Sequence, residues 1–309
     1  MGYGQAVNDL KAVVRSALTS RIGRTVERLG FAQSLFKAYE RILVWRTADL
    51  PEQGADGLPL PPAHLQVLVS GAATPRFEEK GAETASMIRR IARRTGGDIS
   101  GCHAVLDFGV GCGRIARHWA TLTGPAWHAC DYNPELVRWC QDNLPFLRTI
   151  KNELEPPLPY PDDTFDLIYA YSVFTHLTEP QQYRWMDELV RVLEPDGRII
   201  FTTHGDATRR TMEPPIAEAY DRGELAVRFA TGAGSNLCSA FHPEAWVRRK
   251  LLSNLTVLEF VPASSVGTQD FWVVQPTSSF IAERPARVPV GRDRTTNPRG
   301  SRGGTRRGR

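Results

Sequence analysis

The sequence predicts an α/β protein with a doubly wound, mostly parallel sheet of seven strands, preceded by a helical extension. Three observations lead to this prediction. From residue 103 onward, short apolar runs alternate with segments whose apolar residues recur at helical spacing. A turn with three glycines at alternate positions directly follows the first apolar run, and an aspartate ends the second one. This alternation is typical of a parallel sheet that helices cover on both faces.

Residues 1–48 are expected to form one or two helices. Apolar residues recur there at helical spacing in two groups, Leu10, Val13, Val14, Ala17 and Leu18, then Leu35, Ala38, Tyr39 and Ile42. Lysines and arginines occupy the other face, with acidic residues interleaved among them. Such helices could lie on a membrane surface, or dock on their own domain or on a second copy of the chain, and the interleaved acids favour docking. With the turn-rich linker at 51–64, they make a predicted extension over residues 1–75.

The alternating region begins with a predicted helix at 78–97, which two glycines end. Strands are expected at 103–110, 126–131, 165–172 and 198–205, and helices at 113–122, 133–144 and 178–194, the last of them followed by a Pro-Asp-Gly turn. Asn133 and Pro134 are a typical helix start, and Thr178 with Gln181 has the capping-box spacing.

The rhythm changes after Gly205. An irregular insertion is expected at about 206–242, followed by a helix at 243–252 and strands at 255–262 and 269–276. The alternating domain with its insertion therefore covers residues 76–282. Residues 283–309 hold almost no apolar side chains, and we expect a disordered tail there.

Composition and cysteine usage indicate a soluble, cytoplasmic protein. Hydrophobic residues make up 41% and charged residues 23% of the 309. No apolar run approaches the roughly 20 residues that a bilayer span needs, and the first residues lack the apolar core and cleavage site of a signal peptide. The five cysteines are odd in number and include no C-x-x-C pair. We therefore expect reduced thiols, with neither a disulfide framework nor a metal site.

The basic character of the chain is concentrated in its C-terminal stretch. Residues 285–309 hold eight arginines and one aspartate, a net +7, whereas the whole chain has a net +4, so the rest is mildly acidic at −3. Such a tail can bind the phosphate backbone of a nucleic acid. No aromatic residue is interleaved in it for base stacking, so a solubilising tail is favoured over a nucleic-acid partner.

A candidate cofactor site lies at the carboxyl ends of the first two predicted strands. Asp107 stands near the end of the first strand, Gly109, Gly111 and Gly113 form the turn after it, and Asp131 ends the second strand. Ligands of parallel sheets bind beyond these strand ends, and an acid about 20 residues after the turn matches a ribose-binding carboxylate. An ordinary tight turn is the alternative. The strand before it and the helix after it favour a nucleotide-like cofactor.

The spacing of the glycines separates two cofactors. The dinucleotide fingerprint G-x-G-x-x-G would require a glycine at position 114, where Arg114 stands. The chain instead has D-x-G-x-G-x-G from Asp107 to Gly113. This motif resembles the first motif of class I S-adenosylmethionine-dependent methyltransferases, in their small-molecule and glycan-modifying branch. The resemblance covers about residues 104–205, through "CDYNPELVRWCQDNL", "LPYPDDTFDLIYAYSVFTHL" and "ELVRVLEPDGRIIFTTHG".

This resemblance implies a Rossmann-like methyltransferase fold and S-adenosylmethionine as the cofactor. Asp131 would then hold the ribose, with Tyr132 beside the adenine. The residue that contacts the adenine ahead of "LPYPD" would be Asn152 or Glu153, and Tyr171, after the fourth strand, would belong to the same site.

Two histidines are candidate general bases for methyl transfer to a hydroxyl group. His176 follows the fourth predicted strand and His204 ends the fifth, so both are expected at the mouth of one crevice. Taken singly, each is better explained as a structural histidine, but with both at one crevice we expect at least one of them to line the site. In the insertion, Asn236 and His242 are candidates for contact with the acceptor, with a glycine-rich surface loop as the alternative.

The nature of the acceptor is narrowed by a missing motif. Relatives that methylate amines of bases or of glutamine carry an Asn/Asp-Pro-Pro-Tyr/Phe signature after the fourth strand, where this chain has "AYSVF". An oxygen atom of a small molecule or glycan is therefore the expected acceptor. A nicotinamide- or nucleotide-dependent oxidoreductase, or a non-catalytic binding module that keeps the fold, are the alternatives. A homo-oligomer formed through the N-terminal helices is a further expectation.

Overall fold

A computed structural model describes residues 31–47, 50–263 and 269–277. Seven strands form one sheet in the order β3-β2-β1-β4-β5-β9-β8, so the predicted fold class is confirmed. The strands of this sheet are β1 (Ala104–Phe108), β2 (Ala126–Asp131), β3 (Arg148–Lys151), β4 (Phe165–Ala170), β5 (Leu193–Thr203), β8 (Leu255–Val261) and β9 (Asp270–Pro276). Neighbours from β3 to β5 pair in parallel, whereas β9 pairs antiparallel with both β5 and β8.

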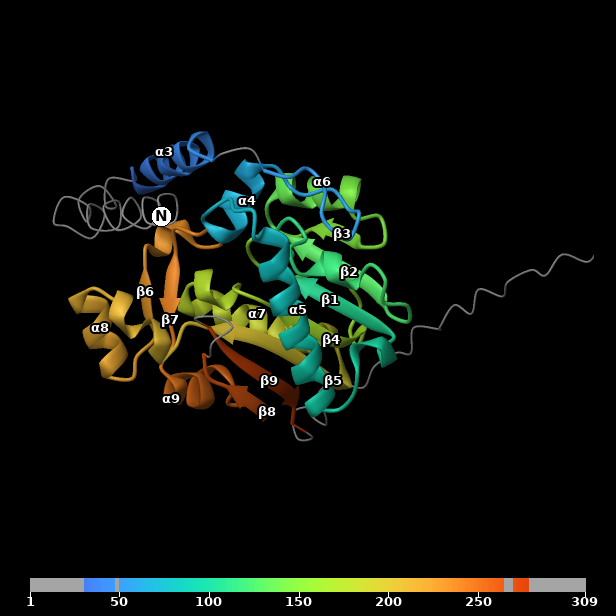
Figure 1. The fold of residues 1–309 in the computed structure, drawn as a ribbon. Helices are drawn as coiled ribbons and strands as arrows, with labels where there is room; N and C mark the ends of the chain where they lie inside the picture. The colour runs from blue at the N-terminus through green and yellow to red at the C-terminus, as the bar shows by residue number, and fades with distance from the viewer. Residues whose placement is uncertain (1–30, 48–49, 264–268, 278–309) are drawn as a thin grey trace, which may run out of the picture.

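Helices cover both faces of the sheet (Figure 1). The α-helices are α3 (Ala32–Trp45), α4 (Ala63–Ser70), α5 (Phe77–Arg94), α6 (Pro134–Asn143), α7 (Glu179–Val192), α8 (Pro214–Asp221) and α9 (Glu244–Trp246), the last continued by a π-helical turn, η6 (Val247–Leu251). Side chains of β1 alternate between two cores, because successive residues of a strand point to opposite faces. Leu106 packs in the core that α7 and α9 cover, and Val105 in the core that α5 and α6 cover.

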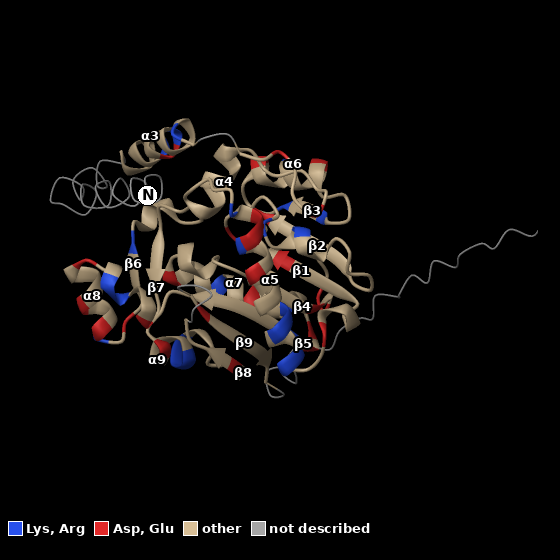
Figure 2. Ribbon diagram, viewed as in Figure 1, with Lys and Arg blue, Asp and Glu red and all other residues tan. Residues whose placement is uncertain are grey.

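The helix starts follow local chemistry. Asn133 caps α6 by accepting a hydrogen bond from the backbone N–H of Glu135 at 2.9 Å, and Thr178 and Gln181 form the predicted capping box of α7. Helix α5 has glutamates in its first turn and arginines in its last, as its two differently charged ends show in Figure 2. This distribution complements the helix dipole and stabilises α5 where it lies.

The predicted helix at 113–122 is wrong. The segment forms only a short 3₁₀ turn, η2 (Ala116–Trp119), because it is buried on several sides rather than along one stripe. Arg117, on what would be the solvent face, is 2% exposed and is held by Asp56. Packing against the linker therefore overrides the helical pattern.

The insertion is more regular than predicted. Residues 206–242 contain 3₁₀ turns, η4 (Asp206–Thr211) and η5 (Ala230–Gly232), the helix α8, and a two-stranded antiparallel sheet of β6 (Ala226–Arg228) and β7 (Ser239–Phe241). No apolar pattern pointed to strand β3 either, since it is four residues long and half of it is exposed. The linker predicted at 51–64 ends where α4 begins, and residues 194–197 form an irregularity within β5 rather than a separate turn.

Helix α3 confirms a helix at the second predicted group, but of the four apolar residues of that group only Tyr39 is buried, whereas Leu35, Ala38 and Ile42 are exposed. It packs on α4 through Tyr39, Leu43 and Val67, and Figure 1 shows the two helices side by side. The first group, Leu10 to Leu18, and the basic tail at 283–309 lie outside the described residues. The domain boundaries at 75 and 282 stay predictions.

Across the described ranges, none of the helices has both the length and the apolar character that a membrane span requires. In the same part of the chain, His, Cys, Asp and Glu side chains form no group of three that could bind a metal ion. All five cysteines are described, and each is buried with a free thiol.

Candidate functional site

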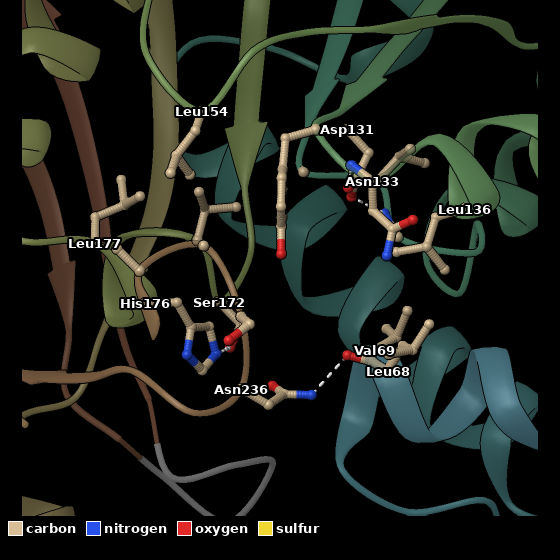
Figure 3. A pocket seen from close by; sticks show the side chains of 18 of the residues that line it. Leu68, Val69, Asp131, Asn133, Leu136, Leu154, Ser172, His176, Leu177 and Asn236 are labelled. Carbon is tan, nitrogen blue, oxygen red and sulfur yellow. Dashed lines mark hydrogen bonds between the residues drawn. The ribbon is translucent and has the colours of Figure 1, made fainter. Parts of the chain in front are cut away.

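A cavity of about 510 Å³ opens at the carboxyl ends of β1, β2 and β4. Strand β1 pairs with β2 on one side and with β4 on the other, so the strand order reverses at β1. Such a reversal leaves a crevice at the carboxyl ends of the strands. Nine of the sequence-predicted site residues line this cavity: Asp107, Gly109, Gly111, Asp131, Tyr132, Asn152, Tyr171, His176 and Asn236. Figure 3 shows several of them around the open space.

The glycine turn approaches its neighbours too closely for side chains. Gly109 and Gly111 have φ of 81° and 58°, in the left-handed region that favours glycine. A Cβ on Gly109 would lie 2.4 Å from Val173, and one on Gly111 would lie 2.7 Å from Val69. Glycine at these two positions therefore allows the backbone of the turn to line the cavity between Val69 and Val173.

Gly113 does not line the cavity. Its φ is 74°, and an added Cβ would lie 2.2 Å from the Cδ1 of Leu144. The third glycine of the motif therefore allows the turn to pack on the segment after α6. The prediction that Gly113 contacts the cofactor has no support in this geometry.

Asp131 is held in place by the glycine turn itself. Its Oδ2 accepts a hydrogen bond of 2.9 Å from the N–H of Gly111, and its Oδ1 accepts one of 2.9 Å from the N–H of Asn133. Burial raises the pKa of Asp131 to about 6. Each carboxylate oxygen retains capacity for a second donor, so this side chain can still bind a hydroxyl group in the cavity.

Asp107 lies deeper, at the end of β1. Tyr169 donates a hydrogen bond of 2.7 Å to its Oδ2, and Trp119 donates one of 3.0 Å to the Tyr169 hydroxyl. Burial raises the pKa of Asp107 to about 7, and the nearby charge of Asp131 acts in the same direction, whereas the Tyr169 hydrogen bond and the charge of Arg114 oppose it. Two buried carboxyl groups in one cavity favour a ligand that carries positive charge.

Asn152 and Glu153 both line the cavity, but their side chains differ in what they offer. Asn152 donates from Nδ2 to the Glu153 carbonyl at 2.7 Å, while its Oδ1 is buried and accepts no hydrogen bond from any residue that the structure describes. The Glu153 carboxylate is 80% exposed and pairs with Lys151. Between the two residues, Asn152 is the one with a buried acceptor available to a ligand.

His176 has a defined tautomer. Its Nδ1 lies 2.7 Å from the backbone carbonyl of Cys238, and because a carbonyl only accepts, Nδ1 carries the proton. Burial lowers the pKa of His176, which keeps the ring neutral near pH 7. The unprotonated Nε2 is 3.5 Å from Ser172 Oγ at the cavity wall, as Figure 3 shows.

Asn236 connects the insertion to α4. Its Nδ2 donates a hydrogen bond of 2.6 Å to the Leu68 carbonyl, drawn in Figure 3. Gln33 of α3 similarly donates from Nε2 to the Thr231 carbonyl at 2.7 Å. These two bonds close one side of the cavity with residues from the extension and the insertion.

The other two predicted histidines lie elsewhere. His242 is 1% exposed and donates from Nε2 to Gln182 at 3.1 Å, and burial lowers its pKa to about 3. It is a core residue, and its predicted contact with an acceptor is not supported. His204 does not line the cavity. The centre of its ring lies 6.4 Å from that of His176 and 5.7 Å from that of Phe241.

Sequence patterns missed the part of the cavity wall that α3 and α4 supply. The side chains concerned are Gln33, Phe36, Lys37, Glu40, Leu68 and Val69. Burial raises the pKa of Glu40. The apolar residues predicted for α3 are not the ones that face the cavity, because Leu35, Ala38 and Ile42 are exposed and Tyr39 packs on α4. Arg114 and Ser172 also line the cavity without having been predicted to do so.

The strand order, the glycine turn and Asp131 together define a class of protein. A family described as "Methyltransferase domain" matches residues 106–201, which run from β1 to β5. The glycine turn and Asp131 thus lie in a segment of the chain that is similar to this methyltransferase family.

Two curated relatives are similar to this chain. Malonyl-(acyl-carrier protein) O-methyltransferase of Halorhodospira halophila is 32% identical over 131 residues, which is 41% of this chain and 43% of the relative. Glycine/sarcosine/dimethylglycine N-methyltransferase of Actinopolyspora halophila is 30% identical over 153 residues, which is 46% of this chain and 26% of the relative. The match therefore spans less than half of either relative. Among solved structures, PH0226 protein from Pyrococcus horikoshii has a TM-score of 0.49 at 14% identity, covering 66% of this chain and 92% of that one.

Proposed function

We propose that this protein transfers a methyl group from S-adenosylmethionine to an oxygen atom of a small molecule or glycan, with His176 as the general base. The observation that carries the proposal is the convergence of Gly111, Asp131 and His176 on one cavity, from the ends of three neighbouring strands. Residues that would bind a nucleoside and a residue that could take a proton thus share one space.

The cavity suits the cofactor by its chemistry as well as its size. A volume of about 510 Å³ lies in the range of small-molecule sites. Asp131 would accept from the ribose hydroxyls, and Asn152 has a buried Oδ1 that an adenine amino group could fill. Tyr132 and Leu154 supply apolar surface on the same side. The buried carboxyl groups of Asp107 and Asp131 match the positive charge of a sulfonium compound.

When bound, S-adenosylmethionine supplies a methyl carbon activated by its positively charged sulfur, so the protein's task is chiefly alignment. His176 would take the acceptor proton at Nε2 as the new bond forms. Its Nδ1–H would stay bonded to the Cys238 carbonyl, which stabilises the imidazolium and keeps the ring from rotating. Leu154, Leu177 and Leu237 line the cavity and would exclude water from the reacting groups.

The methyl group could be transferred to an oxygen or to a nitrogen atom of the acceptor. Of the two relatives, one is an O-methyltransferase and the other an N-methyltransferase. A neutral histidine base favours an oxygen acceptor, because a hydroxyl must lose a proton in the transfer whereas a free amine already has a lone pair. This argument, and the missing Asn/Asp-Pro-Pro-Tyr/Phe signature, support methylation at oxygen.

Calorimetric titration tests the first part of the proposal. The purified chain should bind S-adenosylhomocysteine and should not bind NAD, and Asp131→Ala should lower the affinity for S-adenosylhomocysteine by at least tenfold. Transfer of labelled methyl groups to a panel of phenols, carboxylic acids, glycans and amines then identifies the acceptor, and NMR of the product identifies the methylated atom. Absence of S-adenosylhomocysteine binding would refute the proposal. Binding without transfer to any acceptor would favour the non-catalytic module.

A further inference from the structure

Arg114 lies in the cavity wall directly after the glycine turn. Its guanidinium carbon is 5.4 Å from the centre of the Tyr171 ring, so the side chain turns toward the β4 side of the site. Its presence at position 114 excludes the dinucleotide fingerprint. Its place in the cavity indicates a function of its own.

The Arg114 side chain is half-buried, and no residue that the structure describes accepts a hydrogen bond from its buried Nε. Its charge acts to lower the pKa of Asp107, although no described carboxylate lies within ion-pair distance of it. A buried donor without an acceptor is costly and requires an explanation.

Arg117, three residues further on, shows how the same segment treats an arginine whose function is structural. Its side chain is 2% exposed, and its guanidinium donates to Asp56 Oδ2 at 2.8 Å and to the Leu58 carbonyl at 3.0 Å. Arg114 has no such set of acceptors among the described residues, so its guanidinium is available to a ligand of the cavity.

Asp131 and Arg114 face the cavity from opposite sides of β1. Asp131 ends β2, and Tyr171, under Arg114, directly follows β4. Since neighbouring strands are about 4.8 Å apart, β2 and β4 lie about 10 Å from each other across β1. A ligand whose ribose is at Asp131 and which extends across the turn therefore brings its other end to Arg114.

The chemistry of that other end identifies the contact. S-adenosylmethionine ends in an amino acid, and the α-carboxylate of this amino acid is its single anionic group at neutral pH. A guanidinium group binds carboxylates through two parallel hydrogen bonds and is the side chain best suited to this task. Asp107, on the same wall, is placed to receive the neighbouring ammonium group.

We infer that Arg114 is the counter-ion of the cofactor's α-carboxylate and so fixes which way the cofactor lies in the cavity. This inference rests on the proposed function, because it assumes S-adenosylmethionine as the ligand. It adds a residue that recognises the amino-acid half of the cofactor. The glycine turn and Asp131 do not supply this contact.

Three ligands test the inference by calorimetry without any turnover. They are S-adenosylhomocysteine, its decarboxylated analogue, which lacks only the carboxylate, and 5′-methylthioadenosine, which lacks the whole amino acid. The wild-type protein should bind S-adenosylhomocysteine about 10- to 100-fold more tightly than the decarboxylated analogue, the range expected for a charge-assisted hydrogen-bonded pair. In Arg114→Met this preference should shrink to less than threefold, with the affinity for 5′-methylthioadenosine unchanged within twofold.

Arg114→Lys keeps the charge and should recover part of the preference, and Arg138→Met, at an exposed position on α6, is the matched control. An equal loss for all three ligands in Arg114→Met would show a structural role and overturn the inference. Equal wild-type affinities for S-adenosylhomocysteine and its decarboxylated analogue would overturn it without touching the proposed function. A wild-type protein that binds none of the three overturns the proposed function and the inference with it.

Discussion

His176 and Cys238 are 62 residues apart in the chain, yet the Nδ1 of the histidine donates a 2.7 Å hydrogen bond to the backbone carbonyl of the cysteine. This bond joins the end of β4 to the insertion. It also fixes the tautomer of the ring, because the carbonyl can only accept. The nitrogen that faces the cavity is therefore the basic one, which makes His176 a different kind of residue from the buried His242.

Replacing His176 should separate chemistry from binding. In His176→Gln we expect kcat for the identified acceptor to fall by about 10²- to 10⁴-fold, the usual contribution of a general base. The affinity for S-adenosylhomocysteine, measured by calorimetry, should stay within threefold. His103→Gln, at an exposed position, is the control and should retain wild-type kcat. A large loss of kcat in His204→Gln with none in His176→Gln would show that His204, and not His176, is the base.

The pH profile should carry the signature of this base. Burial lowers the pKa of His176 below its ordinary value of 6.5. A general base acts when it is unprotonated, so kcat should be constant above pH 7 and should fall only as the pH drops through that lowered pKa. Steady-state rates between pH 4.5 and 8 check this. An acidic limb centred above pH 7 would be incompatible with a buried, neutral His176.

Asn152 and Glu153 offer a matched pair for the adenine contact. Because the Oδ1 of Asn152 is a buried acceptor with no described partner, Asn152→Ala should lower the affinity for S-adenosylhomocysteine about tenfold, as loss of one buried hydrogen bond predicts. Glu153→Ala removes an exposed side chain and should change the affinity less than twofold. The reverse order in calorimetry would assign the contact to Glu153.

Gly111 should be sensitive to a single methyl group. In Gly111→Ala, a left-handed φ of 58° and a Cβ 2.7 Å from Val69 act together, whereas Gly57→Ala has a φ of 77° with nothing within 4 Å. Backbone strain alone should lower the free energy of unfolding by about 1–2 kcal/mol in Gly57→Ala. Gly111→Ala should lose more, and adding Val69→Ala should restore part of the difference. Equal losses in the two single variants, measured by denaturant unfolding, would exclude the clash.

The two buried aspartates should make the free protein less stable as the pH rises. Burial raises the pKa of Asp107 to about 7 and that of Asp131 to about 6, from 3.8. Between pH 4 and 7 the folded chain thus holds protons that the unfolded chain releases, and the free energy of unfolding falls across this window. Asp107→Asn keeps an acceptor for Tyr169, and its free energy of unfolding should fall less steeply as the pH rises. Melting temperatures of both proteins at pH 5 and 7.5 test this, and parallel decreases would count against a raised pKa of Asp107.

Most strands and helices of the sheet domain, and the cofactor end of the site, could be predicted from local patterns. The period-2 strands, the helix caps at Asn133 and Thr178, and the glycine turn with Asp131 all depend on residues close in sequence. Where the prediction failed, distant packing was the cause. Arg117 of the 113–122 segment is buried by the linker at Asp56, so no amphipathic helix forms. The short strand β3 and the hairpin of β6 and β7 have no apolar alternation long enough to recognise.

The sequence by itself determined the class of fold and the cofactor end of the site, because strand ends and a glycine turn fix which backbone groups face the crevice. The tertiary structure alone decided which histidine reaches the cavity and in which tautomer, since that depends on the Cys238 carbonyl far along the chain. It also decided that α3 closes the site, and that the Arg114 Nε finds no acceptor among the described residues while Arg117 is bound to Asp56. Burial and hydrogen-bond partners of polar side chains depend on residues distant in sequence, and no local pattern encodes them.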